Sequence, residues 1–401
     1  MVMKTLYLQR NEDRRLNAGH LWVYSNEIDT QRSPLKSFLT GDLVTVKSFN
    51  GKPLGTAYIN PHSLICARLF SHKINAKLSV ELFQNRIRHA LALRDRLYSK
   101  PYYRLIFGES DFLPGIIIDR YNDILVIQIN TAAMELCKDM LLTALENIQL
   151  ANTIVFKNTS SARKQEGLES IVEVVKGNAP DVLQIIENGI SFSSPLLDGQ
   201  KTGWFYDHGN NRRLLNRYTK DKSFLDVFSY VGAWGIQAAV AGAASVHCVD
   251  SSKKALDFVA KNAQHNQVEH KLSITQGDAF EVLKDFKTNK RTFDCINLDP
   301  PAFIKRKKDL KQGLQAYKQI NTLAMALLVS DGILISSSCS FHLSHDALRN
   351  ILLQCAIKLG RHIQILEQGQ QGPDHPIHPA IIETAYLKTF ICRISDPEMV
   401  Y

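Results

Sequence analysis

A single cysteine, Cys339, is placed where a nucleophile is expected. It follows the strand-like run Ile333–Ser337 in the polar segment Ser338-Cys339-Ser340, and a predicted helix begins shortly after it. Polar surroundings near the start of a helix stabilise a thiolate. The other six cysteines fall within strand-like or helical runs, as small buried hydrophobes do. We therefore predict a nucleophilic thiolate at Cys339, and the alternative is one more buried cysteine.

A carboxylate followed by two prolines occurs in the segment Asp299-Pro300-Pro301-Ala302-Phe303, directly after the strand-like run Phe293–Leu298. The prolines stiffen the backbone and free the preceding carbonyls from helix pairing. Rigid carbonyls, a carboxylate and an aromatic ring form a suitable socket for a planar base that is flipped out of its stack. The alternative is a plain Asp-Pro-Pro turn.

Two further acids follow strand-like runs. Asp250 comes directly after Ser245–Val249, where a carboxylate can accept hydrogen bonds from both hydroxyls of a ribose. It can equally begin the next helix as a cap, so both interpretations stay open. Asp278 follows the run Leu272–Thr275, and it is either a contact to an adenine amino group or a turn residue.

Two glycines, Gly232 and Gly235, lie where the run Phe224–Phe228 gives way to a predicted helix. Glycines at such a junction let the backbone turn tightly and approach a ligand. A dinucleotide fingerprint would also need a glycine at the position of Tyr230, which argues against a nicotinamide cofactor. The alternative is a tight turn without a ligand.

These motifs need an element order that brings strand ends together. From about residue 222, strand-like runs alternate with predicted helices at about 233–241, 252–263, 310–329 and 344–359, and strand-like runs recur at 362–366 and 384–392. Such alternation is typical of a doubly wound α/β sheet with parallel strands. Ligands of these sheets bind beyond the carboxyl ends of the strands. All four motifs fall in those loops.

The first half of the chain has a different pattern. Short strands separated by turn signals over residues 4–70 favour a small barrel, and an amphipathic helix follows over Ser79–Ser99. Residues 103–187 then alternate strand-like runs with one predicted helix at about 132–147. We predict a small α+β module there.

Charge is distributed unevenly along the 401 residues. The net charge is +9, and residues 1–100 alone hold 16 basic and 7 acidic residues. This asymmetry favours a polyanionic partner such as nucleic acid, although a basic excess also serves solubility. No apolar run is long enough for a membrane span or a secretory signal, and seven cysteines without a C-x-x-C pair fit no disulfide framework or zinc cluster. We expect a cytoplasmic protein without a metal.

Together the motifs resemble S-adenosylmethionine-dependent class I methyltransferases. The residues that carry this resemblance are Asp226-x-Phe-x-Tyr230-x-Gly232-x-x-Gly235, Asp250, Asp278 and Asp299–Phe303. The closer resemblance is to the ribosomal RNA large subunit methyltransferase I family, cytosine-C5 enzymes with an N-terminal PUA domain. Further matching segments lie along nearly the whole chain, at 19–28, 108–115, 160–167, 200–205, 338–340 and 374–376.

The resemblance implies three domains. They are a PUA-like RNA-binding β-barrel at 1–73, a small α+β middle domain at 74–184 and a Rossmann-like methyltransferase domain at 185–401. One segment departs from the family pattern. After Lys201-Thr202-Gly203 the family usually has an acidic residue, Gln and Arg, whereas this chain has Asp207-His208-Gly209 and then Arg212.

The resemblance also implies site roles. S-adenosylmethionine would lie over Tyr230, Gly232 and Gly235, with Asp250 on its ribose. Asp278 would lie near adenine, and Asp226, Asp299 and Lys201 would complete the cofactor site. A Cys339 thiolate would add to C6 of cytosine, which activates C5. Asp299 would meet the N3 edge of the base, and Pro300, Pro301 and Phe303 would line its socket.

The implied partner is large-subunit ribosomal RNA. Arg14, Arg15, Lys4 and Arg10 of the barrel, and Lys305, Arg306, Lys307 and Lys308 near the base socket, are suited to phosphates. The residues identify neither the base that removes the C5 proton nor the oligomeric state, so a homodimer stays open. Two alternatives remain: an RNA methyltransferase acting on an exocyclic amine (N2 of guanine or N6 of adenine), and a non-catalytic RNA-binding protein.

Overall fold

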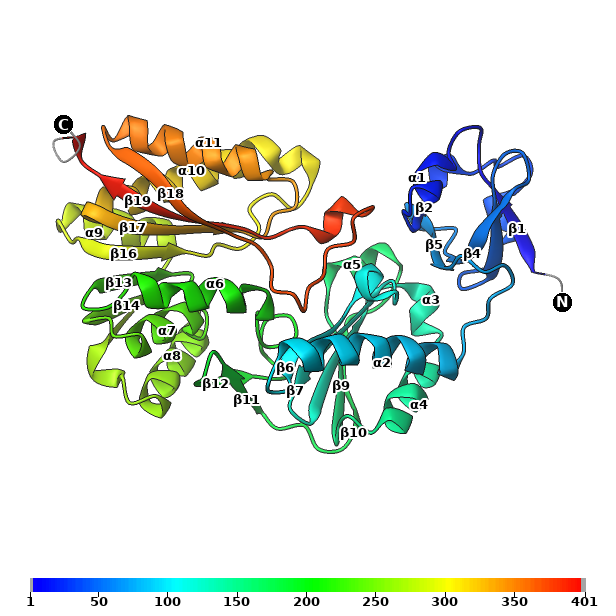
Figure 1. Ribbon diagram of the computed structural model, residues 1–401, viewed down its shortest axis with the longest axis horizontal. Helices are drawn as coiled ribbons and strands as arrows, with labels where there is room; N and C mark the ends of the chain where they lie inside the picture. The colour runs from blue at the N-terminus through cyan, green and yellow to red at the C-terminus, as the bar shows by residue number, and fades with distance from the viewer. Residues whose placement is uncertain (1–2, 398–401) are drawn as a thin grey trace. The chain divides into compact units, whose positions relative to one another are not determined.

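The computed structural model describes residues 3–397. The chain forms two compact units (Figure 1). Unit 1 comprises Met1–Leu183, Pro195–Trp204 and Pro373–Thr384, and unit 2 comprises Gln184–Ser194, Phe205–Gly372 and Ala385–Tyr401. The three-domain division at residues 73 and 184 stays a prediction.

A five-stranded sheet forms the N-terminal part of unit 1. Its strand order is β1-β3-β4-β5-β2, and its core consists mainly of aliphatic side chains such as Val23, Val44 and Ile59. The strands are β1 (Lys4–Tyr7), β2 (Trp22–Tyr24), β3 (Leu43–Lys47), β4 (Pro53–Ile59) and β5 (Ile65–Ser71), and a short helix α1 spans Arg14–Asn17. The predicted barrel strands are therefore confirmed.

A second five-stranded sheet follows in unit 1, in the order β10-β9-β8-β7-β6. Helix α2 (Val80–Leu97) precedes it, and the Ser79 hydroxyl caps this helix by accepting from Leu82 N at 3.2 Å. The remaining elements are β6 (Tyr102–Phe107), β7 (Ile116–Tyr121), β8 (Ile124–Ile129), α3 (Ala132–Glu135), α4 (Lys138–Ile148), β9 (Thr153–Asn158), α5 (Ser161–Gln165) and β10 (Ile171–Lys176). The single helix predicted at 132–147 is wrong, because Cys137 leaves helical geometry between α3 and α4.

Unit 2 is built on a seven-stranded sheet in the order β15-β14-β13-β16-β17-β19-β18. Its strands are β13 (Ser223–Val227), β14 (Ser245–Asp250), β15 (Leu272–Gln276), β16 (Phe293–Leu298), β17 (Leu328–Ser338), β18 (His362–Gly369) and β19 (Lys388–Ser395). A separate two-stranded sheet consists of β11 (Val182–Glu187) and β12 (Ile190–Pro195). The expected parallel order holds except at β19, which is antiparallel to both neighbours.

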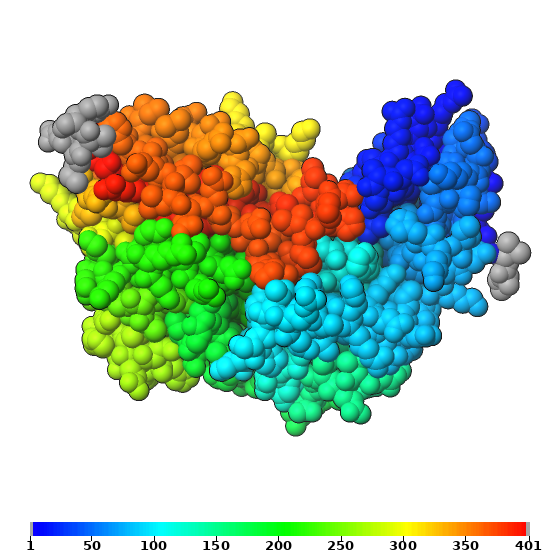
Figure 2. All heavy atoms as spheres, viewed as in Figure 1, coloured from blue at the N-terminus to red at the C-terminus, as the bar shows by residue number. Residues whose placement is uncertain are grey.

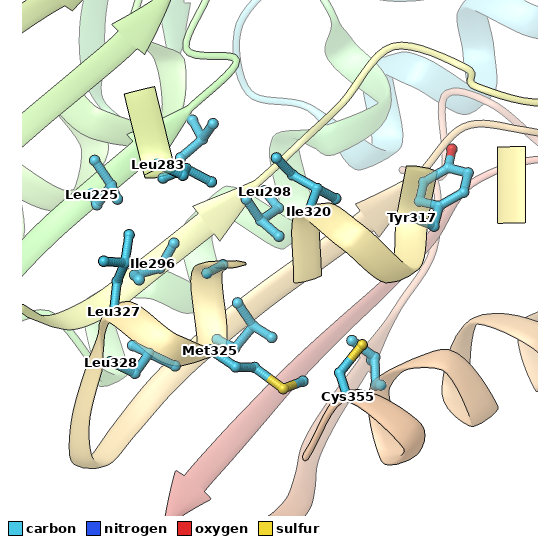
Figure 3. Close-up of a cluster of buried hydrophobic side chains, with 14 of the residues drawn as sticks. Leu225, Leu283, Ile296, Leu298, Tyr317, Ile320, Met325, Leu327, Leu328 and Cys355 are labelled. Atoms are coloured by element: carbon cyan, nitrogen blue, oxygen red, sulfur yellow. The ribbon is translucent and has the colours of Figure 1, made fainter. Parts of the chain in front are cut away.

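Helices cover both faces of this sheet. Helices α7 (Ala233–Val240) and α8 (Lys253–His265) pack on one face, and α9 (Ala279–Thr288), α10 (Leu310–Leu327) and α11 (His345–Lys358) pack on the other. Figure 3 shows the second interface, where Ile296 and Leu298 of the sheet lie against Ile320 and Met325 of α10. Helix α9 and the short helix α6 (Gly209–Leu214) were not predicted from the sequence.

Strand register brings the motifs to one edge. Val227 of β13 pairs with Val249 of β14 and with Leu298 of β16, so the residues after them lie in one row. Strand order reverses at β13, because β14 and β16 flank it on opposite sides. Ligands of open α/β sheets bind at such a reversal.

Candidate active site

The loop between β13 and α7 has an unusual backbone. Phe228, Tyr230 and Gly232 adopt positive φ angles of 65°, 49° and 84°. Left-handed geometry is costly for bulky residues and persists where the surrounding structure imposes it, commonly at ligand sites. The predicted glycine loop is therefore held in a strained turn at the reversal point of the sheet.

Asp226 holds this loop from beneath. It is fully buried, and its carboxylate accepts from Gly235 N at 2.8 Å and from Asn297 Nδ2 at 2.9 Å. A Cβ on Gly235 would lie 2.7 Å from Cys248 Sγ and 3.2 Å from Asp226, so only glycine fits there. Burial raises the pKa of the Asp226 carboxyl to about 7. Asp226 thus serves the predicted cofactor site by fixing the loop.

Asp250 and Asp278 separate into different roles. The Asp250 carboxylate accepts from Tyr230 N at 2.9 Å and from Ser252 N at 2.8 Å, which ties β14 to the glycine loop. Ser252, and not Asp250, caps helix α8. Asp278 is the cap of α9, since its Oδ1 accepts from Phe280 N and Glu281 N.

The residues at this edge fit the predicted cofactor in two respects. Asp250 ends β14 and Asp299 follows β16, the two strands that flank β13, and there a ribose and a cationic sulfonium find acceptors. The hydroxyl of Ser229, in the same loop, is buried and has no hydrogen-bond partner among the described residues. Buried polar groups normally have a partner, so this hydroxyl is suited to a ligand atom.

Asp299 is oriented by two donors. His208 Nε2 lies 3.2 Å from Oδ1, and Trp234 Nε1 donates to Oδ2 at 3.1 Å. Burial opposes ionisation, but the attraction and hydrogen bond of His208 and the hydrogen bond of Trp234 hold the pKa of Asp299 below its ordinary value. The side chain keeps 21% of its surface exposed, so an ionised acceptor faces the site.

His208 belongs to the segment that departs from the family pattern. It ends the 3-10 turn Tyr206–His208, is buried, and its Nδ1 lies 3.3 Å from Asn211 Nδ2. Asn211 Nδ2 also donates to Thr389 Oγ1 at 3.3 Å. The sequence showed the departure but not that His208 contacts Asp299, because the two residues lie far apart in the chain.

The other residues of this segment serve the fold. Arg212 forms a two-point ion pair with Glu187, at 2.6 and 2.7 Å, and also donates to Phe205 O. Asp207 accepts from Tyr386 OH at 2.6 Å. These contacts hold the turn that presents His208.

The proline segment directly follows Asp299, after the end of β16. Pro300 is buried and Pro301 is exposed. Phe303 is half-buried, with its ring centroid 4.9 Å from that of Tyr317 and 6.0 Å from that of Phe280. Phe303 is thereby fixed on the apolar core, as a platform for a base requires.

Cys339 lies between two buried serines at the end of β17. The Ser338 hydroxyl donates to Tyr317 OH at 2.8 Å, and the same phenol lies 2.9 Å from Ser340 Oγ. Ser340 Oγ in turn accepts from Ile304 N at 3.2 Å. The segment that begins at Asp299 and the segment that carries Cys339 are therefore bonded to each other.

Cys339 differs from the other cysteines in exposure. None of the seven forms a disulfide, and six are buried whereas Cys339 is partly exposed. Burial raises the pKa of thiols such as Cys295 and Cys392 to about 12. The predicted nucleophile is thus the cysteine residue that keeps partial exposure, and its segment is bonded to the proline segment.

A basic groove lies between the start of α10 and α11. It has a volume of about 660 Å³, and its lining includes Lys307, Lys308, Lys311 and Lys318 and no acidic residue. On the face drawn in Figure 2, the segment that leads into α10 (yellow) projects beside α11 (orange). Lys305 and Arg306, in this segment, are exposed.

Three predicted site residues, Lys201, Arg14 and Arg15, belong to unit 1. Lys201 is exposed and has a positive φ of 47°. Arg14 is exposed on α1. Arg15 is engaged within the barrel, by an ion pair with Glu27 at 2.7 Å and by stacking over Tyr24 at 4.8 Å.

The described residues offer neither a metal-binding cluster nor a membrane-spanning helix. No cluster of three or more His, Cys, Asp or Glu side chains among residues 3–397 is arranged to hold a metal ion. Within the same range, no helix is both long and apolar enough to cross a bilayer.

Curated proteins named ribosomal RNA large subunit methyltransferase I are similar to this chain over nearly its whole length. The protein of Aliivibrio fischeri is 36% identical over 395 residues, covering 97% of this chain and 99% of its own. That of Tolumonas auensis is 36% identical over 399 residues, with the same coverage. That of Pseudoalteromonas translucida is 34% identical and covers 98% of this chain and 100% of its own.

Family models match two parts of the chain. A PUA-like domain model matches residues 6–72, and the model described as conserved hypothetical protein 95 matches residues 211–333.

Solved structures share the fold. A candidate SAM-dependent methyltransferase from Streptococcus mutans has a TM-score of 0.84 at 23% identity, covering 98% of this chain and 100% of its own. A candidate methyltransferase in complex with SAH has a TM-score of 0.85 at the same identity and coverage. These likenesses confirm the expected fold class, a Rossmann-like α/β unit preceded by a PUA-like barrel.

Proposed function

The chain belongs to the ribosomal RNA large subunit methyltransferase I family, and we propose that it forms 5-methylcytosine in this RNA through a Cys339 adduct. The methyl donor is S-adenosylmethionine. The observation that carries the choice of base is the partly exposed Cys339 thiol, which lies next to Ser340 and so beside the Asp299 segment. Transfer to an exocyclic amine would need no such thiol.

The chemistry follows from the low reactivity of cytosine C5. The Cys339 thiolate adds to C6, which breaks the aromaticity of the ring and makes C5 an enamine carbon that attacks an electrophilic methyl group. Loss of the C5 proton then expels the thiolate and restores the ring. Asp299, ionised and fixed by His208 and Trp234, accepts a hydrogen bond from the amino group beside the N3 edge.

The cofactor would be held at the edge where β13 and β14 end. Bound S-adenosylmethionine supplies an electrophilic methyl group on a sulfonium. Tyr230, Gly232 and Gly235 form the loop beneath it, and Asp250 accepts from the ribose. Asp278 would lie near adenine, and the role of Lys201, which belongs to unit 1, stays a prediction from the family resemblance.

RNA binding would depend on charge. We place RNA phosphates along Lys305, Arg306 and the groove between α10 and α11, and on Arg14 and Arg15 of the barrel. Ribosomal RNA as substrate makes the cytoplasm the expected location.

A second candidate function is methyl transfer to an exocyclic amine of guanine or adenine. The ionised Asp299 favours it, because a carboxylate accepts from an amino group of either purine as well as from cytosine. This reaction does not use Cys339, so replacing Cys339 distinguishes the two candidate functions.

The test replaces Cys339 by Ala and by Ser and uses ribosomal RNA from a strain that lacks the enzyme. We expect wild type to yield 5-methylcytidine by mass spectrometry of the nucleosides, and both variants to lose transfer. Calorimetric titration with S-adenosylmethionine should remain unchanged, which shows that the variants are folded. Retained transfer in the variants, or a product methylated on nitrogen, would exclude the thiolate route; absent cofactor binding by wild type would favour a non-catalytic protein.

A further inference from the structure

A buried lysine lies next to the proposed nucleophile. Lys388 is the first residue of β19 and pairs in register with Ser338, the residue before Cys339. Its side chain is only 5% exposed, and its Nζ donates to Ser340 O at 2.7 Å. The Lys388 amine therefore contacts the residue after Cys339, and the Lys388 backbone pairs with the residue before Cys339.

The charged neighbours of Lys388 come from three elements. Cys339 at the end of β17 attracts the ammonium, and His345 of α11 repels it. Tyr317 of α10 also interacts with Cys339, and burial raises the pKa of this phenol, which keeps it neutral. No carboxylate forms an ion pair with Lys388 in the described part of the chain. The thiol is thus the group best placed to balance the lysine charge.

A buried ammonium without a carboxylate is costly. Burial lowers the pKa of Lys388 to about 8, against the attraction of Cys339. A thiolate beside the ammonium removes this cost, because each ion supplies the counter-charge of the other. The same arrangement is what a nucleophilic cysteine needs.

Another buried lysine shows what a structural role looks like. Lys157 has a pKa that burial lowers to about 8, and its Nζ donates to Leu196 O at 2.5 Å and Gly199 O at 2.7 Å. Its charged neighbour is Asp198. Lys157 therefore fastens a loop next to an ordinary counter-ion, whereas the charged neighbour that attracts Lys388 is Cys339.

We propose that Lys388 is the positioning residue that ionises Cys339, a role that rests on the function proposed above. The neutral Lys388 amine accepts the proton of the Cys339 thiol, which leaves a thiolate and an ammonium side by side. The thiolate then attacks C6, and its expulsion at the end of the reaction restores the pair. Lys388 also holds the Ser340 carbonyl, so it fixes the loop that aims the sulfur.

The test measures ionisation of Cys339 without the methyl-transfer reaction. Iodoacetamide alkylates thiolates, and the other cysteines are buried, so mass spectrometry of the Cys339 peptide at several pH values reports this thiol. In wild type we expect the pH midpoint of Cys339 alkylation to lie below the ordinary thiol value of about 8.5. An ordinary or higher midpoint in wild type overturns the proposal without any variant.

Two variants sharpen the result. Lys388→Met keeps the length of the side chain without the charge, and we expect its midpoint to rise by about one pH unit, which is about tenfold slower alkylation below both midpoints. Lys388→Arg keeps a cation beside the sulfur, so its midpoint should stay near that of wild type. An unchanged midpoint in a folded Lys388→Met variant overturns the proposal, with thermal unfolding and cofactor titration as controls.

The outcomes separate this inference from the proposed function. A low wild-type midpoint that depends on Lys388, in an enzyme that makes no 5-methylcytidine, would keep the ion pair and remove the cytosine reaction. If the enzyme forms 5-methylcytidine but the alkylation midpoint of Cys339 is the same in wild type and Lys388→Met, the cytosine reaction stands and the role of Lys388 is excluded.

Discussion

Two aspartates of the candidate site, Asp226 and Asp299, have pKa values shifted in opposite directions because their surroundings differ. Asp226 is buried beneath the glycine loop, and burial raises its pKa to about 7. Asp299 meets His208 and Trp234, which hold its pKa below the ordinary value. The first carboxyl therefore serves packing and the second presents a negative charge, as acid pairs in different environments do.

Methyl transfer should depend on the contact between His208 and Asp299. We expect His208→Ala to lower kcat/KM for methyl transfer by about 5- to 150-fold, because a buried partner lost from a charged group costs about 1–3 kcal/mol. His208→Gln retains an N–H donor at this position and should stay close to wild type. Steady-state kinetics of both variants measure the difference, and equal activity of His208→Ala and wild type would contradict the role.

The raised pKa of Asp226 predicts a dependence of stability on pH. Between the ordinary value near 4 and about 7, the folded state binds more protons at this group than the unfolded state. Its contribution to the free energy of unfolding therefore falls as pH rises through this window, by at most about 1.4 kcal/mol per pH unit. Asp226→Asn should remove this slope, as urea unfolding at pH 5, 6 and 7 can show; parallel curves for the two proteins would refute it.

At the scale of elements, the carboxyl edge of the unit 2 sheet determines the site. Val227, Val249 and Leu298 lie in one row, so the loops after β13, β14 and β16 converge. Strand β19 adds Lys388 to the same edge, because it runs antiparallel to its neighbour β17 and begins where β17 ends. The site thus combines residues that follow parallel strands with a residue at the start of the antiparallel strand β19.

The cap of helix α9 provides a test that separates stability from cofactor binding. Asp278→Ala should lower the free energy of unfolding by about 1 kcal/mol, because it removes the acceptor for Phe280 N and Glu281 N. Asp278→Ser keeps a capping oxygen and should keep the stability. If Asp278 contacts adenine, both variants bind S-adenosylmethionine more weakly in calorimetry; unchanged affinity of Asp278→Ser would limit this residue to the cap.

At the scale of the whole molecule, positive charge is found in two places. The first 100 residues, within unit 1, carry the net excess, and the lysine-lined groove lies in unit 2. A substrate that engages both would be bound with a steep dependence on salt.

Charge reversal in the groove should weaken RNA binding. We expect Lys311→Glu and Lys318→Glu each to lower affinity for ribosomal RNA and to reduce the slope of log K against log salt concentration by about one. Lys261→Glu, an exposed reversal on α8 across the sheet, is the matched control. Filter binding at several salt concentrations tests this, and equal slopes for groove and control variants would remove the groove from the RNA path.

The sequence alone determined the order of elements and the chemistry at strand ends. Alternating apolar runs predicted β13, β14, β16 and the helices α7, α8, α10 and α11, because local hydrophobic periodicity reflects burial on a sheet or helix face. The acids, the glycines and Cys339 stood out because they interrupt these runs. Helix α9 escaped prediction, although Asp278 at its start is a typical capping residue.

Only the tertiary structure decided which groups touch. His208 contacts Asp299, which lies 91 positions later in the chain. Lys388 contacts Ser340, which lies 48 positions earlier. No local sequence pattern records contacts over such separations. Long-range contacts depend on strand register and on which turn presents a side chain. The same reason separates Asp226 from Asp299. Asp226 lies near the end of β13 and Asp299 directly follows β16, but only packing shows that the first is buried beneath the loop and the second is partly exposed.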